Sequence, residues 1–416
     1  MERSVVGIDV GSHRILVLVA EIGDETEHTK VQPGVDTRIV GVGHVSSKGI
    51  KKGVIVNVSE ATASIAEAVE KAEQSSGYHI ERAYLGVSGA HIASRNSQGV
   101  VGVSRRDRGI TPDDVDRALE AAGAIVLPQN QELLHILPRT FTVDGQEGVR
   151  DPLGMHGFWL EVEAHVVMGS TTAIQNLTKC VENAGVTVSE LLLTSLGAGN
   201  AVLSETEKEM GVVLVDIGGG TTDIAIFIEG TVWHTRCLSI GGEYITNDIA
   251  IGLRLPQASA EQVKLRHGHA LAKQVSEEER FTISPYGENT PVVVPRWKLA
   301  EIIQARVEEI FESIQQEIKR SGYSGLLPAG LVFCGGTAQL PGLRELARES
   351  FELPVQIGIP KGVSGLTDQI SNPSAAVAAG LVQWTSMWDE GGSSWRSLRM
   401  PWWKRLGPWL RTLLPG

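Results

Sequence analysis

The stretch VVGIDVGSHRILVLVAEI, residues 5–22, is rich in β-branched residues on both sides of a Gly-Ser turn. This pattern predicts two short strands joined by a tight hairpin. The stretch GVVLVDIGGGTTDIAIFIEG, residues 211–230, repeats the plan: an apolar run ends in Asp, a glycine turn with hydroxyl side chains follows, and a second apolar strand comes next. Aligning Asp9 with Asp216 superimposes the two turns. The repeat predicts a duplicated α/β fold with a cleft between its halves.

The segment between the two hairpins changes character along its length. Residues 59–77 have helical periodicity, with Ser59 as a plausible cap and Gly77 closing the helix. From 83 to 168 the pattern becomes alternating strands around one helix that begins in TPDDVDRALEAAG, residues 111–123. This change predicts a small inserted α+β domain.

The segment after the second hairpin is predicted to contain two long helices, over 258–274 and 296–322, on either side of a proline-containing stretch. Residues 330–351 then read as strand, glycine turn and helix, and 372–385 read as a final helix. The expected division is 1–82 and 167–205 for the first half, closed by 361–387; 83–166 for the inserted domain; 206–242 and 311–360 for the large part of the second half; 243–310 for its small subdomain; 388–394 for a linker; and 395–416 for a terminal segment.

The composition is that of a globular chain, with 42% hydrophobic and 21% charged residues among 416. The formal charge is −12; without the five basic residues of 395–416, 32 basic residues remain against 49 acidic ones, or −17. Such a body should repel nucleic acid, so we expect no nucleic-acid partner. Three cysteines without a CxxC spacing indicate a reducing, cytoplasmic setting. The sequence shows no signal-peptide pattern and no apolar run of membrane-spanning length, so membrane contact should be peripheral.

The chemistry expected at the two turns is phosphate binding. A tight turn of Gly, Ser and Thr points several backbone N–H groups at one spot, which makes an anion site. Two facing turns could hold the β- and γ-phosphates of a nucleotide, with Ser12 and Thr221–Thr222 adding hydroxyl donors and Arg14 a positive charge. Asp9 and Asp216 end the strands before the turns, where a hydrated Mg²⁺ would find carboxylate oxygens.

A third glycine turn, Gly335–Gly336, follows the apolar run of 330–334 and could let the backbone approach an adenine ring closely. Glu261 and Lys264 lie three apart on a predicted helix and could reach a ribose and an adenine edge, or simply form an exposed ion pair. A glycine turn alone often exists only for its φ > 0 conformation, but here the turns recur in register. The chain has no GxxxxGK[ST] motif, which excludes a Walker-type site.

Three glycine turns in this order, within a duplicated α/β plan, resemble the actin-like ATPase superfamily. Within it, nearly the whole chain resembles the FtsA family of bacterial cell-division proteins. The stretch DGQEGVRDPLGMHG, residues 144–157 of the inserted domain, is the most discriminating. The other segments that carry the resemblance are IDVGSHRILVLVAEI, VDIGGGTTDIAIF, GGEYITNDIAIGL, FCGGTAQLPGL and NPSAAVAAGLV.

The resemblance implies ATP and Mg²⁺ as ligands, with Asp9 and Asp216 near the metal through water. ATP hydrolysis should be weak or absent, and the candidates for a catalytic group are Asp9, Asp216 and Asp223. His13 departs from the family pattern, in which a small residue is expected in the first loop. The residues expected to bind ATP are Gly11, Ser12, His13 and Arg14 in the first loop; Gly218, Gly219, Gly220, Thr221 and Thr222 in the second; Gly335, Gly336 and Thr337 on the adenosine side; and Gly241, Gly242, Asn247, Glu261 and Lys264 nearby.

The resemblance also implies a biological role. Such a protein self-associates, tethers the ring of the tubulin-like protein FtsZ to the cytoplasmic face of the cell membrane at the division septum, and helps recruit later division proteins. The C-terminal peptide of FtsZ would dock on 243–310, where Arg296, Lys298 and above all Arg306 could meet an acidic peptide or merely form a solvated helix face. The alternatives are a pilus-assembly adaptor and a small-molecule kinase of the same superfamily.

The last segment, WRSLRMPWWKRLGPWLRTLLPG at 395–416, holds four Trp and five basic residues. On a helical wheel its Trp and Leu side chains gather within an arc of about 140° and the basic ones lie outside it. A helix over 402–414 would be roughly 20 Å long, too short for a ~30 Å hydrocarbon core, so we expect it to lie on an anionic membrane surface, kinked at Pro408. Docking on a protein surface is the alternative. The residues expected to meet the membrane are Trp395, Trp402, Trp403, Lys404, Arg405, Leu406, Trp409, Leu410, Arg411, Leu413 and Leu414.

Overall fold

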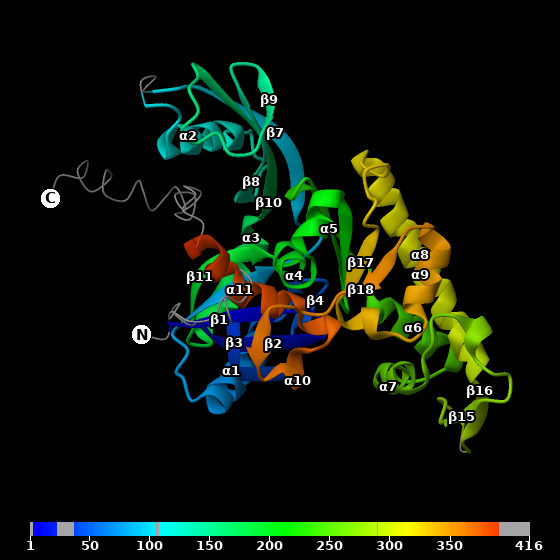
Figure 1. Cartoon of the computed structure of the whole chain (residues 1–416). Coiled ribbons are helices and arrows are strands. Elements are labelled where there is room, and N and C mark those ends of the chain that lie inside the picture. Colours follow the sequence, from blue (N-terminus) through cyan, green and yellow to red (C-terminus); the bar gives the residue numbers. More distant parts are fainter. Residues whose placement is uncertain (1–2, 23–36, 105–107, 289, 391–416) are drawn as a thin grey trace.

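The first half of the protein is built on a six-stranded sheet (Figure 1). The computed structural model describes residues 3–22, 37–104, 108–288 and 290–390. In spatial order the strands of this sheet are β11 (Thr187–Leu193), β6 (Arg82–Val87), β1 (Arg3–Val10), β2 (Arg14–Ile22), β3 (Thr37–Ser46) and β19 (Val363–Gly365). β1 and β2 form the hairpin predicted from residues 5–22, with Asp9 opposite Leu16.

The second half repeats this sheet. Its five strands are, in order, β18 (Val355–Ile357), β17 (Leu331–Cys334), β12 (Val212–Ile217), β13 (Thr222–Ile228) and β14 (Thr231–Leu238). In both sheets the hairpin is antiparallel and its first strand runs parallel to the next neighbour, β6 or β17. Asp216 lies opposite Asp223 just as Asp9 lies opposite Leu16, so the two hairpins share one register. The predicted duplicated α/β fold is confirmed.

Helices cover both faces of the first sheet. α1 (Val58–Ser76) packs on β3, and α11 (Ala376–Glu390) packs on β1. Gly43 faces α1 and Gly7 faces α11; the strand register puts these glycines on opposite faces of the sheet. Asn57, and not the expected Ser59, caps α1, because its side chain accepts a hydrogen bond from the Glu60 N–H, while Gly77 ends the helix as predicted.

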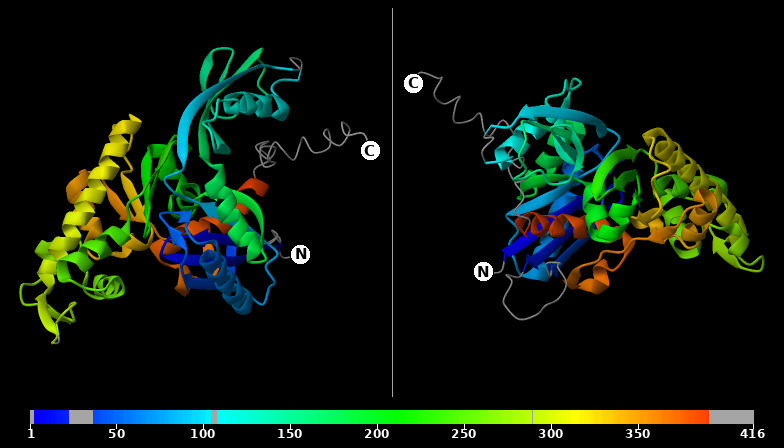
Figure 2. Two further views of the ribbon diagram at one scale, coloured as in Figure 1. Left: turned by 180° about the vertical axis from the view of Figure 1, so that it is seen from behind. Right: turned by 45° about the horizontal axis from the view of Figure 1, so that its top comes forward.

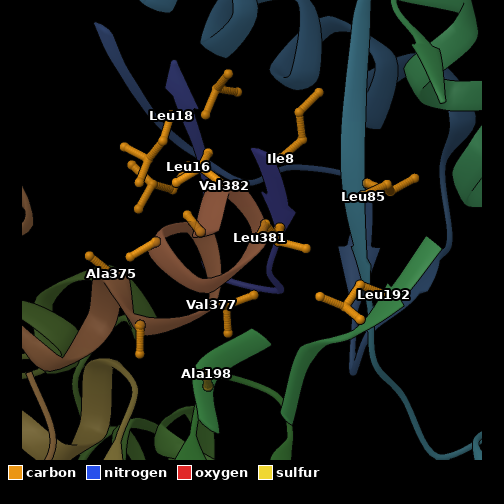
Figure 3. Close-up of a cluster of buried hydrophobic side chains, with 14 of the residues drawn as sticks. Ile8, Leu16, Leu18, Leu85, Leu192, Ala198, Ala375, Val377, Leu381 and Val382 are labelled. Carbon is orange, nitrogen blue, oxygen red and sulfur yellow. The ribbon is translucent and has the colours of Figure 1, made fainter. Parts of the chain in front are cut away.

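The core of the first half lies on both faces of its sheet, under α11 on one face and under α1 on the other. Figure 3 shows Val377, Leu381 and Val382 of α11 beside Ile8 and Leu16 of the sheet. α11 also crosses α4 (Thr194–Val202) at close range: a methyl group on Gly380 would lie 1.7 Å from the carbonyl oxygen of Gly197. Only glycine permits this approach.

The inserted domain projects from the first half as a four-stranded sheet backed by one helix (Figures 1 and 2). Its elements are, in sheet order, β7 (Ala93–Gly102), β10 (Trp159–Ser170), β8 (Gln131–Val143) and β9 (Gln146–Val149), with α2 (Pro112–Gly123). The sheet contacts β14 of the second half: His165 Nε2 lies 2.9 Å from Thr235 Oγ1, and the Arg139 guanidinium lies 4.0 Å from the centre of the Trp233 ring.

Three expected boundaries are wrong. Residues 83–87 do not begin the inserted domain, because they form most of β6, whose Ala83, Leu85 and Val87 are buried beside β1. The boundary at 310 falls within one continuous helix, α8 (Arg296–Ser321), which Gly322 ends in the left-handed conformation. α11 extends to Glu390, three residues into the expected 388–394 linker.

The other elements of the described chain are α3 beside α1, several short elements, and the remaining elements of the second half. They are β4 (Ile50–Lys51), β5 (Val54–Ile55), α3 (Thr171–Asn183), α5 (Glu205–Met210), α6 (Gly242–Leu253), α7 (Gln257–His267), η1 (Ala272–Gln274), β15 (Arg280–Ile283), β16 (Val292–Pro295), η2 (Gly336–Gln339), α9 (Leu343–Phe351), α10 (Thr367–Ile370) and η3 (Pro373–Ala375). None of the described helices is both long enough and apolar enough to cross a bilayer. The 395–416 segment, with every residue expected to meet a membrane, lies outside the described residues.

Candidate functional site

The two predicted phosphate turns have the same backbone geometry. In the first, the Gly11 N–H donates to the Arg14 carbonyl over 3.0 Å; in the second, the Gly218 N–H donates to the Thr221 carbonyl over 2.9 Å. These bonds join equivalent positions of the aligned hairpins. Each turn is therefore closed by the same hydrogen bond, from one residue to the third residue after it. The backbone N–H groups of the two residues between them lie at the tip of the turn.

The two turns face each other directly. A methyl group on Gly219 would lie 2.9 Å from His13 Cβ, and one on Gly220 would lie 2.6 Å from Ser12 Oγ. His13 is exposed at this meeting point. Turns more than 200 residues apart in the sequence thus come together as the duplication predicts, and any side chain at 219 or 220 would push them apart.

The second turn is held from behind by α6 and η2. The Gly218 carbonyl accepts hydrogen bonds from the Gly242 N–H at 2.9 Å and from Thr337 Oγ1 at 3.0 Å. The Glu243 N–H donates to the Gly219 carbonyl over 2.8 Å. Gly241 lies against the same two carbonyls, where a Cβ would clash. The structure therefore gathers Gly241, Gly242 and Thr337 at the second turn.

Three carboxylates, Asp9, Asp216 and Asp223, lie at the base of the turns. Burial raises the pKa of Asp9 to about 6; Arg14 opposes this rise and Asp223 adds to it. Burial, with repulsion from Asp223 and Asp9, holds the pKa of Asp216 well above its usual range. Arg14 provides the opposing positive charge, and its guanidinium also donates to the Ser374 carbonyl. Such a cluster favours an additional cation, because a nearby positive charge lowers carboxylate pKa values.

Gly335 connects the third turn to this cluster. Its φ of 87° and ψ of 171° are open to glycine and strained for other residues. A methyl group on Gly335 would lie 2.3 Å from Asp216 Oδ1 and 2.5 Å from the Ile217 carbonyl oxygen. Gly336, in contrast, is exposed, and a methyl group there would have no heavy atom within 4 Å. The third turn therefore brings one tightly packed and one open glycine to the cleft.

Glu261 and Lys264 form an ion pair on α7, with Lys264 Nζ 2.7 Å from Glu261 Oε2. The pair is not the exposed one considered from the sequence, because the two side chains are only 13% (Lys264) and 20% (Glu261) exposed. Lys264 also donates to the Gly242 carbonyl at 3.2 Å, and Thr246 contacts both members of the pair. Burial alone would raise the pKa of Glu261, but Lys264 and Thr246 bring it below its ordinary value.

Two expected ligand residues lie away from the tips of the turns. Thr222 is fully buried and its hydroxyl donates to the Ile240 carbonyl over 2.8 Å, which leaves Thr221, 8% exposed, as the only threonine of the pair with any exposed surface. Thr221 Oγ1 lies 3.4 Å from Asp223 Oδ2. Asn247 is exposed on α6, next to the Thr246 that contacts the ion pair. The alternation of β13 explains Thr222, since neighbouring strand residues point to opposite faces.

The structure adds residues that the sequence did not reveal. Ser88, just after β6, donates to Asp223 Oδ2 over 2.6 Å and lies 3.5 Å from Cys237 Sγ. The Lys52–Gly53 turn, between β4 and β5, contacts both phosphate turns, as described below. Because β6 was assigned to the inserted domain, Ser88 was not considered near the cleft. A Lys-Gly pair between Ile50–Lys51 and Val54–Ile55 was the available signal for a turn at Lys52.

These residues fit a nucleotide with a hydrated metal ion. The turns supply backbone donors for phosphate oxygens, and the buried acids supply charge for a cation. Among the described residues, no three His, Cys, Asp or Glu side chains converge on a metal site of their own. The assignment of Asp9 and Asp216 to a hydrated metal stays a prediction.

Comparison with known proteins places the chain in a family. The model of the family described as "Cell division protein FtsA" matches residues 213–380, and that of the "SHS2 domain inserted in FTSA" matches 89–168. FtsA of Pseudomonas aeruginosa is 43% identical over 382 residues, which cover 92% of this chain and 89% of that protein. FtsA of Bacillus subtilis is 38% identical, covering 91% and 82%, and FtsA of Escherichia coli is 32% identical, covering 98% of both.

Solved structures share the fold at low sequence identity. The PilM–PilN type IV pilus biogenesis complex matches with a TM-score of 0.63 and 16% identity, covering 92% of this chain and 98% of that one. MreB5 of Spiroplasma citri bound to ADP matches with a TM-score of 0.53 and 14% identity, covering 93% and 96%. These likenesses show the actin-like fold alone, whereas the identities of 32 to 43% over nearly the full length decide the family. The chain belongs to the FtsA family of bacterial cell-division proteins.

Proposed function

We propose that this protein binds ATP between its two glycine turns and acts as a membrane adaptor in cell division. In this role it self-associates, holds FtsZ at the cytoplasmic face of the membrane at the septum, and helps recruit later division proteins. The observation that supports the nucleotide site best is the pair of turns in matched register, each closed by the same backbone hydrogen bond and set face to face. Family membership supports the biological role.

In the proposed site, the first turn (residues 11–14) and the second (218–221) bind the phosphates through backbone N–H groups, with Ser12 and Thr221 adding hydroxyls. Asp9 and Asp216 hold Mg²⁺ through water. Gly335, Gly336 and Thr337 form the adenosine side. The buried Glu261–Lys264 pair lies beside Gly242, which supports its assignment to the same region.

We propose that ATP serves mainly as a structural ligand that keeps the cleft closed and permits self-association. Hydrolysis needs a group that orients a water in line with the γ-phosphate. Asp223 follows the second turn, but it already accepts hydrogen bonds from Ser88 and Thr221. Burial raises the pKa of Asp223 although these hydrogen bonds oppose the rise, but both bonds occupy Oδ2 and fix the carboxylate in place. We therefore expect it to orient a water poorly and turnover to be slow or absent.

The proposed docking surface for the FtsZ C-terminal peptide is the small subdomain around α6, α7 and the first turns of α8. Its cations are not free: Arg306 binds Asp248 through two nitrogens, at 2.5 and 3.1 Å, and also Glu309, while Arg296 binds Glu279 at 2.5 Å. An acidic peptide would exchange with these carboxylates. Lys298, whose ammonium lies 5.6 Å from the centre of the Trp297 ring, has the most accessible charge of the three.

The domain division is kept as a proposal with its boundaries moved to the observed elements: the inserted domain begins after β6, and α8 belongs to one unit. The proposed membrane contact is the amphipathic 395–416 segment, and the −17 charge of the rest of the chain supports its separation from an anionic surface.

The test of membrane attachment is co-sedimentation with vesicles that contain anionic lipid. The full chain is compared with a chain lacking 395–416 and with Trp409→Glu, which places a charge on the apolar face of the predicted helix. We expect the full chain to sediment and both variants to stay in solution. Ser393→Glu, in the expected linker before the segment, introduces the same charge outside it; this matched control should retain most binding. Equal sedimentation of all four proteins would reject the proposed attachment.

A further inference from the structure

Lys52 occupies a strained position in the turn between β4 and β5. The turn has two residues, Lys52 with φ 52° and Gly53 with φ 74°, both in the left-handed region. Two-residue hairpins of this kind favour Asn or Gly at the first position, and a side chain such as that of Lys costs about 1 kcal/mol or more there. A residue kept in an unfavourable backbone conformation at a cleft indicates a role for its side chain.

The Lys52–Gly53 turn lies against both phosphate turns at once. The Gly53 N–H donates to Ser12 Oγ over 3.0 Å, which attaches this turn to the first phosphate turn. A methyl group on Gly220 would lie 3.0 Å from the backbone of Lys52, so the second phosphate turn packs on the same residue. The backbone of Lys52 therefore occupies a fixed place where the two halves of the protein meet.

The Lys52 side chain crosses from the first half to α6 of the second. Its Nζ donates to the Tyr244 hydroxyl over 2.6 Å and lies 5.0 Å from the centre of the Tyr244 ring. The Arg306 guanidinium lies 5.8 Å from the same ring centre and is held by Asp248. Tyr244 is thus contacted by a cation from each half. Contacts of this geometry attract each cation to the ring.

We propose that Lys52 and Tyr244 form a latch that keeps the cleft closed over bound nucleotide, and that Lys52 is a positioning residue of the nucleotide site. This inference rests on the proposed function. The latch joins the halves at the phosphate turns themselves, so a nucleotide leaving the site must either break it or pass it. Tyr244 also contacts Arg306, which binds Asp248 on the proposed partner surface. The Tyr244 ring therefore couples closure of the cleft to the position of Arg306.

The test uses the full-length protein and the release rate of a fluorescent ATP analogue with Mg²⁺, measured by displacement with excess ATP. Lys52→Asn suits the left-handed turn but removes the ammonium, and Tyr244→Phe keeps the ring but removes the hydroxyl. A charge-assisted hydrogen bond of this kind corresponds to roughly a tenfold or larger change, so each variant should release nucleotide faster by about tenfold or more. Lys51→Asn, at the exposed neighbouring lysine, is the matched control and should release at the wild-type rate.

The double variant Lys52→Asn/Tyr244→Phe separates a latch from two independent defects. If the residues act as one latch, the double variant releases nucleotide no faster than about the larger single effect, whereas independent roles would multiply. Lys52→Arg should restore slow release, because Arg can also donate to the Tyr244 hydroxyl. Multiplicative effects, or unchanged release in Lys52→Asn, would overturn the latch.

Failure of the proposed function gives a different result. If the wild-type protein binds no ATP analogue, the nucleotide site is rejected together with the role of Lys52 in positioning it. The contact itself is then tested by urea unfolding, without nucleotide, of the wild type, Lys52→Asn, Tyr244→Phe and the double variant. Non-additive midpoints for Lys52→Asn and Tyr244→Phe would support a latch between the halves, and additive ones would overturn it.

Discussion

Gly335→Ala should strongly destabilise the protein, although it adds a single methyl group. The backbone of Gly335, at φ 87° and ψ 171°, lies in a region almost confined to glycine, which costs about 1 to 3 kcal/mol for another residue. The added Cβ would also lie 2.3 Å from Asp216 Oδ1 and 2.5 Å from the Ile217 carbonyl oxygen. Overpacking of this kind costs about 1 to 3 kcal/mol. The expected loss in the free energy of unfolding is therefore about 2 to 6 kcal/mol.

The assay is equilibrium urea unfolding without nucleotide, followed by far-ultraviolet circular dichroism. Gly336→Ala is the matched control, since a methyl group there would meet no heavy atom within 4 Å and the residue has no positive φ. The control should stay within about 0.5 kcal/mol of the wild type. A Gly335→Ala protein as stable as Gly336→Ala would refute the packing of the third turn on Asp216.

Two further predictions concern the same core. Between about pH 4 and 6, Asp9 of the folded protein keeps a proton that the unfolded chain has released, so the free energy of unfolding should fall as pH rises. The fall should be less steep in Asp9→Asn. Equal slopes for the two proteins, measured in EDTA without nucleotide, would contradict the raised pKa of Asp9. Gly380→Ala should lower the free energy of unfolding by about 3 kcal/mol because the added methyl group meets the Gly197 carbonyl. The control Gly325→Ala has open space around it and should leave the free energy of unfolding unchanged. Equal urea midpoints for the two variants would exclude the close crossing of α4 and α11.

The hairpins and their alignment could be predicted from the sequence because each is a local unit. The apolar strands, the Asp that ends the first strand and the glycine turn lie within about twenty residues, and pairing within a hairpin follows from its turn. The shared register, with Asp9 opposite Leu16 and Asp216 opposite Asp223, bears this out. The same locality allowed Gly77 and Gly322 to be recognised as helix ends.

Contacts between distant elements could not be predicted in this way. β6 has the apolar pattern of any buried strand, and its parallel pairing with β1 and β11 shows that it belongs to the first sheet. The hydrogen bond from Ser88 to Asp223 spans 135 positions and the one from Lys52 to Tyr244 spans 192. No periodicity within one segment reports such pairs. Thr222 was included with Thr221 because the sequence does not show at which residue the turn becomes strand.

The actin-like fold explains why the important residues lie at junctions. The duplication brings equivalent turns face to face, and each turn is fixed by backbone hydrogen bonds, so its position depends on the two sheets. The side chains that differ between the halves, such as Arg14 and Asp223, then determine the charge of the cleft.

A crystal structure with a non-hydrolysable ATP analogue and Mg²⁺ tests the central claim most directly. The proposed site predicts phosphate oxygens within hydrogen-bond distance of the backbone N–H groups of residues 11–14 and 218–221, and a metal whose water ligands contact Asp9 and Asp216. Adenine is expected beside Gly335 and Gly336. Phosphates bound elsewhere, or density absent from the cleft at saturating analogue, would contradict the account.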